Sequence, residues 1–215
     1  MSKGGKYIPA LSFDWLTPLY DPLLRWGMRE ETFKRALIVQ AQIKPGQRLL
    51  DLGCGTGTLT LLIKQLHPDS EVVGLDGDPN VLEIARGKAA QAGVTITLDH
   101  GLAFQLPYPD GSFDRVLSSL VLHHLTSEDK QRAAHEVFRV LRPGGELHVA
   151  DFGQPRSAYA KLLAPVMQHL EEASDNFRGL LPEMFRGAGF APVDEPAQFT
   201  TVFGGLSLYQ ARKPT

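Results

Sequence analysis

The chain has 215 residues, of which 43% are hydrophobic and 21% charged, and its formal net charge is −2. This size and composition are typical of one globular domain with a full hydrophobic core. The near-neutral charge argues against nucleic acid as a partner, because proteins that bind it usually carry a strongly basic surface. The single cysteine, Cys54, excludes an intrachain disulfide.

The sequence predicts neither a secretory signal nor a membrane-spanning helix. No apolar run reaches the roughly 18 residues that a spanning helix needs. We therefore expect a cytoplasmic protein with no stable membrane insertion. The oligomeric state does not follow from the sequence.

Short apolar strands alternate with amphipathic helices along most of the chain. Lys44–Gly46 ends the first helix, Asp78 before a proline begins another, and Gly93 suits the end of that helix. Thr126 and Asp129 have the spacing of a capping box. In chain order, we predict helices over 30–43, near 59–66, over 79–91 and after 126, and strands over 47–53, 71–76, 94–98, 114–121 and 146–151.

After residue 152 the pattern predicts two helices, followed by a hairpin-like end over 189–195 and 201–213. Strands and helices that alternate in this way indicate an α/β fold with a doubly wound, mostly parallel sheet. In such sheets, ligands bind beyond the carboxyl ends of the strands. The residues at these ends are therefore the candidates for a functional site.

Three glycines, Gly53, Gly55 and Gly57, follow the first predicted strand and precede the next helix. Glycines at this place allow a tight turn and a close approach of ligand to backbone. The turn alone does not distinguish a dinucleotide from another nucleoside ligand. However, the spacing G-C-G-T-G lacks the last glycine of the dinucleotide pattern, and the carboxylate of Asp51 suits a cationic ligand better than a diphosphate.

Four segments in the same order resemble the class I S-adenosylmethionine-dependent methyltransferases. They read LLDLGCGTG, VVGLDGDPNVLEIAR, LPYPDGSFDRVLSSLVLHHL and VFRVLRPGGELHVADF, and the similarity runs from Arg48 to Phe152. It implies a Rossmann-like, seven-stranded sheet with a reversed last strand near Val202–Ala211. One methyltransferase domain would then comprise an N-terminal helical cap segment (1–45), the cofactor-binding core (46–152), substrate-side helices (153–190) and a C-terminal hairpin (191–215).

The resemblance also implies how S-adenosylmethionine binds. The turn after the first strand would meet the methionine part, and Asp76 would accept both ribose hydroxyls, since a carboxylate offers two acceptor oxygens. Asp78 has the alternative role of a helix cap. Leu102 replaces the acid that contacts the adenine amino group in the family, so neighbouring backbone and packing would hold the ring. The implied cofactor-binding residues are Asp51, Gly53, Cys54, Gly55, Asp76, Gly77, Asp78, Leu102, Ala103, Phe104 and Ser118, the last through its carbonyl group.

His123 and His124 follow the fourth core strand, where the acceptor approaches the methyl group in the family. Either imidazole could remove a proton from the acceptor as a catalytic base. The alternative is that the pair supports the loop by packing. Leu120 stands where metal-dependent relatives would need an acid, so we predict no metal.

The acceptor pocket is expected to include Trp15, Tyr20, Trp26 and Tyr159, with ordinary helix packing as the alternative for these aromatic side chains. The segment PLYDPLLRWG is similar to the start of the ubiquinone/menaquinone-biosynthesis methyltransferases. This similarity implies a small acceptor of aromatic or lipophilic character.

Two other functions remain open from the sequence. One is an S-adenosylmethionine-binding protein of this family without catalytic activity. The other is a nicotinamide oxidoreductase, although Tyr159 and Lys161 do not have the Tyr-x-x-x-Lys spacing of the short-chain type.

Overall fold

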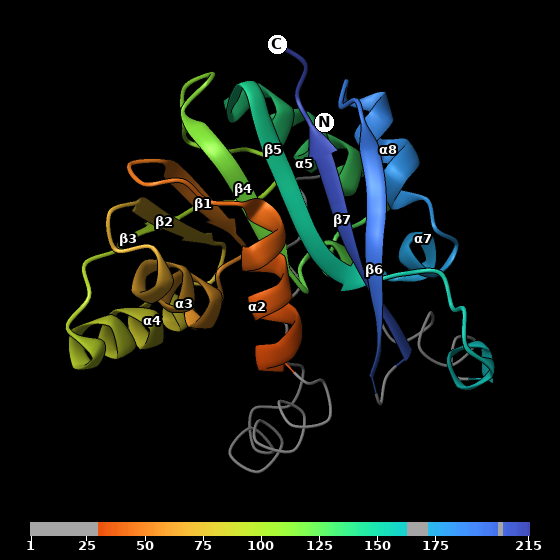
Figure 1. Ribbon diagram of the computed structural model, residues 1–215, viewed down its shortest axis with the longest axis horizontal. Helices are drawn as coiled ribbons and strands as arrows, with labels where there is room; N and C mark the ends of the chain where they lie inside the picture. Colours follow the sequence, from red (N-terminus) through yellow and green to blue (C-terminus); the bar gives the residue numbers. More distant parts are fainter. Residues whose placement is uncertain (1–29, 163–171, 202–203) are drawn as a thin grey trace, which may run out of the picture.

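The computed structural model describes residues 30–162, 172–201 and 204–215, which form a seven-stranded sheet in the order β3-β2-β1-β4-β5-β7-β6 (Figure 1). Strands β1 to β5 pair in parallel, and β7 is antiparallel to both of its neighbours. The predicted fold class and reversed strand are thus confirmed. The strands are β1 (Arg48–Leu52), β2 (Glu71–Asp76), β3 (Thr97–His100), β4 (Phe113–Ser119), β5 (Leu141–Phe152), β6 (Val193–Thr201) and β7 (Gly204–Arg212).

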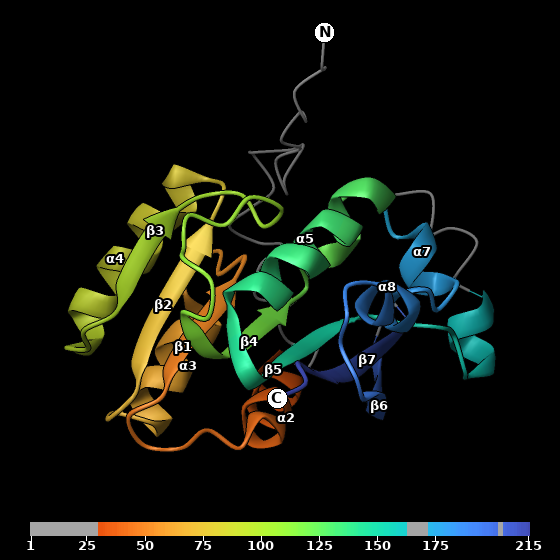
Figure 2. The same ribbon diagram turned by 90° about the horizontal axis from the view of Figure 1, so that it is seen from above.

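Helices cover both faces of the sheet. Helices α2 and α3 lie on one face, and α5 and α8 lie on the other (Figures 1 and 2). No helix in the described ranges is both long and apolar enough to cross a membrane. The helices are α2 (Glu30–Ala41), α3 (Thr58–Leu66), α4 (Pro79–Ala92), the 3-10 helix η1 (Leu122–His124), α5 (Ser127–Val140), α7 (Ser174–Phe177) and α8 (Leu181–Gly187).

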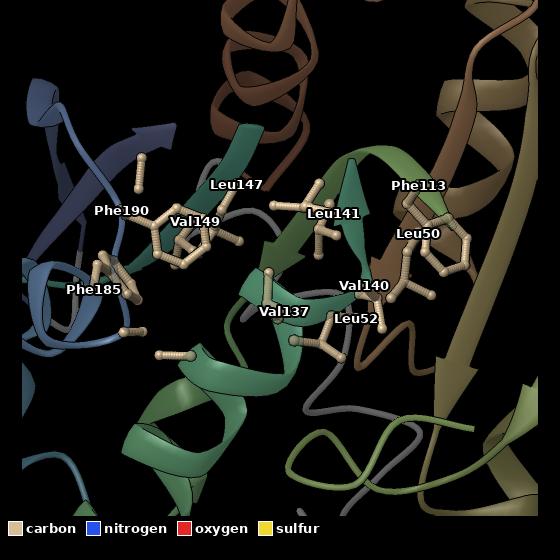
Figure 3. Packing of buried hydrophobic residues seen from close by; sticks show 14 of the residues in the cluster. Leu50, Leu52, Phe113, Val137, Val140, Leu141, Leu147, Val149, Phe185 and Phe190 are labelled. Atoms are coloured by element: carbon tan, nitrogen blue, oxygen red, sulfur yellow. The ribbon is translucent and has the colours of Figure 1, made fainter. Parts of the chain in front are cut away.

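Alternating side chains of the central strands build one buried cluster on each face. Leu50 and Leu52 of β1 pack toward α5 and α8, whereas Leu49 packs toward α2 and α3. Figure 3 shows the first cluster, in which Val137 of α5 and Phe185 of α8 meet the strands. Since successive strand residues point to opposite faces, a nearly continuous apolar strand is what a doubly covered sheet requires.

The helix ends follow the expected capping chemistry. Asp78 precedes α4 and accepts a hydrogen bond from the backbone N–H of Asn80 at 2.8 Å, and Gly93 ends the helix with a left-handed φ of 65°. Thr126 precedes α5 and accepts from the N–H of Asp129 at 3.2 Å. These three predictions are confirmed.

Several strand boundaries differ from the predicted ones, and the first strand of the C-terminal hairpin, β6, covers Val193–Thr201 rather than 189–195. Strand β5 begins at Leu141 rather than at Glu146, because the R-P-G-G segment is a bulge within the strand: Phe113 pairs with Leu141, but Arg115 pairs with Glu146. Strand β3 covers Thr97–His100 rather than 94–98, since the chain near residue 94 still closes the end of α4. Strand β4 ends at Ser119, two residues before its predicted end at residue 121.

Candidate active site

A cavity of about 340 Å³ lies beyond the carboxyl ends of β1, β2 and β4. The turn after β1 and the end of β2 line one part of it, and the loops after β3 and β4 line another. Helix α2 contributes two charged side chains. The lining residues are Glu30, Lys34, Gly53, Cys54, Gly55, Thr56, Thr58, Leu75, Asp76, Gly77, Gly101, Leu102, Ala103, Phe104, Ser119, Leu120, Val121, His124, Leu125, Thr126 and Asp129.

Gly53 and Gly55 serve different purposes in the turn after β1. A Cβ atom at Gly53, whose φ is 70°, would lie 2.4 Å from Cγ2 of Val121, so this glycine allows the loop after β4 to pack closely. A Cβ atom at Gly55, whose φ is 52°, would meet nothing within 4 Å. Gly55 therefore presents bare backbone to the cavity, as the sequence led us to expect of a residue that approaches a ligand.

The carboxylate of Asp76 lines the cavity at the end of β2 in a fixed orientation. Its Oδ2 accepts a hydrogen bond from the N–H of Gly55 at 2.8 Å, and its Oδ1 accepts from the N–H of Asp78 at 2.9 Å. Each carboxylate oxygen has a further lone pair with which to accept a ligand hydroxyl. Gly77 also lines the cavity, but Asp78 does not, because its carboxylate caps α4.

Asp51 lies behind the glycine turn and not on the cavity surface. Its Oδ2 accepts a hydrogen bond from the hydroxyl of Thr60 at 2.6 Å, and the residue is 1% exposed. Burial raises the pKa of Asp51 from 3.8 to about 6, although the Thr60 hydroxyl and the charge of Lys34 act in the opposite direction. Because the turn covers its carboxylate, Asp51 can affect a ligand in the cavity only through its electrostatic field.

Cys54 lines the cavity between the two glycines. Burial, together with the charges of Asp51 and Asp76, raises the pKa of its thiol far above the usual range. The thiol is therefore protonated at neutral pH, and a nucleophilic role does not fit this environment.

The loop after β3 forms the apolar part of the cavity. Leu102, Ala103 and Phe104 all line it, and the guanidinium of Arg132 lies 4.7 Å from the centroid of the Phe104 ring. Where the family has an acid, this loop has Leu102. The carboxylate that the sequence analysis missed here is Asp129, which comes from α5 and lines the same cavity.

Ser118 does not line the cavity. It is buried at the end of β4, where its hydroxyl donates a hydrogen bond to the carbonyl oxygen of Leu52 at 3.0 Å. Its neighbours Ser119 and Leu120 line the cavity instead, and Leu120 has a left-handed φ of 59°. A positive φ at a leucine is a strained conformation of the kind that is common at functional sites.

His123 and His124 have different environments although they are adjacent. His123 is 4% exposed, and its Nδ1 lies 2.8 Å from Oδ1 of Asp151. His124 lines the cavity, and the two ring centroids are 4.0 Å apart. Only His124 is therefore placed to meet a substrate, while His123 belongs to the support beneath it.

Asp151 organises the loop that carries the two histidines. It is buried at the end of β5, and burial alone would raise its pKa. The interactions with His123, together with the N–H of Phe152 and the charge of His124, outweigh burial and hold the pKa below its usual value. A buried carboxylate of this kind fixes the groups that donate to it. Besides His123, the donors are the backbone N–H groups of Val121, Leu122 and Phe152 and the side-chain amide of Asn176.

Of the aromatic residues expected around the acceptor, the structure describes Tyr159. Its side chain is 47% exposed and is absent from the lining of this cavity. Trp15, Tyr20 and Trp26 lie outside the described residues. Within residues 30–162, 172–201 and 204–215, no group of three or more His, Cys, Asp or Glu side chains could hold a metal ion.

Known proteins with similar sequences point to one family. The family described as Methyltransferase domain matches residues 49–145. A demethylmenaquinone methyltransferase of Symbiobacterium thermophilum is 33% identical over an alignment that covers 88% of this chain and 86% of that protein. This chain belongs to the class I S-adenosylmethionine-dependent methyltransferases.

Two further comparisons agree with this family. A demethylmenaquinone methyltransferase of Thermus thermophilus is 38% identical to this methyltransferase over 146 residues, which cover 66% of this chain and 65% of that protein. A solved S-adenosylmethionine-dependent methyltransferase from Methanosarcina mazei has the same fold, with a TM-score of 0.68 at 21% identity, covering 82% of this chain and 97% of that one.

The residues of the cavity suit S-adenosylmethionine, the methyl donor of the family. Asp76 presents two acceptor oxygens for the vicinal hydroxyls of a ribose, and Gly55 leaves room for a ligand against the backbone. Leu102 and Phe104 offer apolar surface of the kind on which an adenine ring packs. The cavity of the methyltransferase thus combines, between the β3 loop and α2, polar and apolar groups of the kind that an adenosine ligand needs.

Proposed function

We propose that this methyltransferase methylates the ring of a reduced quinone of the demethylmenaquinone type. The names of its relatives support this acceptor, because proteins that match most of the chain are called demethylmenaquinone methyltransferases. The cavity is consistent with such an acceptor, since Leu120, Val121 and Leu125 give its inner part an apolar surface.

The observation that carries the proposal is the position of His124. Among the described residues that line the cavity, it is the only histidine, and the apolar residues Val121 and Leu125 lie on the same loop. An acceptor ring with a hydroxyl group requires such a surface: apolar side chains for the ring and one polar group for the hydroxyl. Histidine is also the side chain that most often acts as a general base.

When bound, S-adenosylmethionine supplies an electrophilic methyl group on its sulfonium. In the proposed mechanism, His124 accepts the proton that the ring hydroxyl loses, which leaves the neighbouring ring carbon electron-rich. After this carbon has gained the methyl group, its own hydrogen leaves as a proton to solvent, and His124 returns its proton to the ring oxygen. The Asp151–His123 pair holds η1 and thereby orients His124. The apolar loop excludes water and aligns the ring, and alignment alone can lower a barrier by up to about 7–11 kcal/mol.

A direct test incubates the purified protein with S-adenosylmethionine and a short-chain demethylmenaquinol, kept reduced, and follows the quinone by mass spectrometry. The proposal predicts a product that is heavier by one CH₂ unit and is formed together with S-adenosylhomocysteine. The absence of this product from a protein that binds the cofactor and methylates a different acceptor, such as an amine or a catechol, would contradict the proposal.

Replacing His124 by alanine should lower kcat about 100-fold or more, the usual effect of losing a general base, and leave the affinity for S-adenosylhomocysteine nearly unchanged. His135→Ala, which removes an exposed histidine on α5, is the control with unchanged kcat. His123→Ala should instead destabilise the fold by about 1–3 kcal/mol, because it removes a hydrogen-bond partner of the buried carboxylate of Asp151. An unchanged kcat for His124→Ala would show that His124 is not the general base.

A further inference from the structure

Helix α7 places two polar side chains in the interior of the protein. Asn176 and Asp175 are both buried, although asparagine and aspartate usually lie at the surface. Burying such groups costs free energy unless hydrogen bonds replace their contacts with water. The partners of these two side chains therefore indicate what they do.

Asp175 fastens α7 to α5. Its Oδ2 accepts a hydrogen bond from the hydroxyl of Ser127 and lies 3.4 Å from Nζ of Lys130. The ammonium group of Lys130 is buried as well, and it also donates to the carbonyl oxygen of Glu172. Burial lowers the pKa of Lys130, and the charge of Asp175 acts in the opposite direction. This buried ion pair fixes the turn of chain that carries Asn176.

Asn176 joins α7 to the carboxylate beneath the histidine loop. Its Nδ2 donates a hydrogen bond at 3.1 Å to Oδ1 of Asp151, the same oxygen that lies 2.8 Å from Nδ1 of His123. An oxygen accepts hydrogen bonds along preferred directions, so donors that share it restrict one another. The rings follow the same path, because Phe177 stacks on Phe152 and the ring of Phe152 meets that of His123.

We propose that Asn176 is a positioning residue for methyl transfer, which holds His124 at the cavity through Asp151 and His123. The ring centroids of His123 and His124 are 4.0 Å apart, so the orientation of one ring constrains the other. Asp151 also accepts from the backbone N–H of Leu122 in the same 3-10 turn. Helix α7 itself contributes no residue to the lining of the cavity, so its effect on the reaction is indirect.

This role rests on the proposed function, in which His124 is the base. It gives the connection between β5 and β6 a part in the reaction besides covering the sheet. Lys130 and Asp175 support the role from a distance, since they hold the turn and do not touch the histidines in the contacts described above.

Two substitutions separate the hydrogen bond of Asn176 from its packing. Asn176→Ala removes both, whereas Asn176→Asp keeps the shape and replaces the donor by an oxygen. With S-adenosylmethionine and a reduced demethylmenaquinone, Asn176→Ala should lower kcat about 10- to 100-fold, the size expected when a reacting group is misplaced, and leave the KM for S-adenosylmethionine nearly unchanged. Asn80→Ala, which changes an exposed asparagine of α4, is the control with unchanged kcat.

The pH dependence tests the hydrogen bond itself. In Asn176→Asp the introduced carboxyl group faces the carboxylate of Asp151, and two carboxyl groups that share a site retain one proton more strongly. Once protonated, the introduced group can donate to Asp151 as the amide does. Its kcat relative to the wild type at the same pH should therefore rise as the pH falls from about 8 to about 6, whereas the ratio for Asn176→Ala should stay low. The other titratable groups of this network remain in both variants: His123 and His124 of η1, Lys130 of α5, Asp175 of α7 and Tyr209 of β7.

Nitrogen-15 NMR of the histidine rings, in the complex with S-adenosylhomocysteine, provides a measurement that does not depend on the acceptor. In Asn176→Ala the ring signals of His123 and His124 should shift, and that of the exposed His135 should not. Asn176→Asp, which leaves no cavity, serves for the same comparison if Asn176→Ala does not fold.

The outcomes separate this role from the proposed function. An unchanged kcat for Asn176→Ala, unshifted signals of His123 and His124, or a ratio for Asn176→Asp that does not change with pH would each overturn the role of Asn176. A wild-type protein that binds S-adenosylhomocysteine but forms no product from the demethylmenaquinol would refute the proposed function, and the histidine signals would then decide the role of Asn176.

Discussion

Replacing Asp51 by asparagine should change how the stability of the protein depends on pH. The carboxyl group is fully buried, and burial raises its pKa from 3.8 to about 6. Between these two values the folded state binds more protons than the unfolded state, so the free energy of unfolding falls as the pH rises through this window. At about 1.4 kcal/mol per pKa unit, the ionised carboxylate lowers stability by about 3 kcal/mol above pH 6.

Asparagine keeps an oxygen that can accept the hydrogen bond from Thr60 but removes the titration. Urea unfolding, followed by circular dichroism between about pH 4 and pH 7, should show the wild type losing about 2–2.5 kcal/mol relative to Asp51→Asn, since part of the effect has already occurred at pH 4. Any effect of the substitution that does not depend on pH cancels in this comparison. Asp69→Asn, which changes an exposed aspartate after α3, is the control whose curve should run parallel to the wild type. If the free energy of unfolding of Asp51→Asn changes with pH in parallel with that of the wild type, the reasoning is refuted.

Other substitutions test the turn after β1 and the end of β2. Gly55→Ala should lower stability by only about 1–2 kcal/mol and weaken binding of S-adenosylhomocysteine. Gly53→Ala should unfold at a lower temperature than Gly55→Ala, because its Cβ would lie 2.4 Å from Val121. The reverse order of the two unfolding temperatures would contradict this. In calorimetric titrations, Asp76→Ala should weaken S-adenosylhomocysteine binding about tenfold or more, because the ribose loses a charged acceptor; unchanged affinity in the folded variant would remove the ribose assignment. Asp78→Ala should lower stability by about 1 kcal/mol through the lost cap and keep the affinity; a large loss of affinity would place Asp78 in the site.

The parts of the fold that depend on local chemistry could be predicted from the sequence. The caps at Asp78 and Thr126 and the left-handed end at Gly93 are properties of a few adjacent residues. The parallel core followed from strands that are apolar on both faces and alternate with helices. The predicted start of β5 at residue 146 is too late, because the sequence alone does not show that the strand continues through the R-P-G-G bulge.

The site could be predicted only as far as neighbours in sequence determine it. His123 and His124 are equivalent in the sequence, but the 3-10 turn places one over Asp151 and the other at the cavity. Lys34 and Asp129 reach the cavity from helices, so their contribution depends on tertiary packing rather than on any local motif. Ser118 and Ser119 are neighbours at the end of β4, but only Ser119 lines the cavity, because successive strand residues point to opposite faces of the sheet.

A crystal structure of the protein with S-adenosylhomocysteine tests the account most directly. The account predicts the ribose hydroxyls on the carboxylate of Asp76, the adenine on the loop from Leu102 to Phe104, and the amino-acid part at the turn after β1. The sulfur atom should face His124. A ligand bound elsewhere, or bound in this cavity with its adenine toward α2, would contradict it.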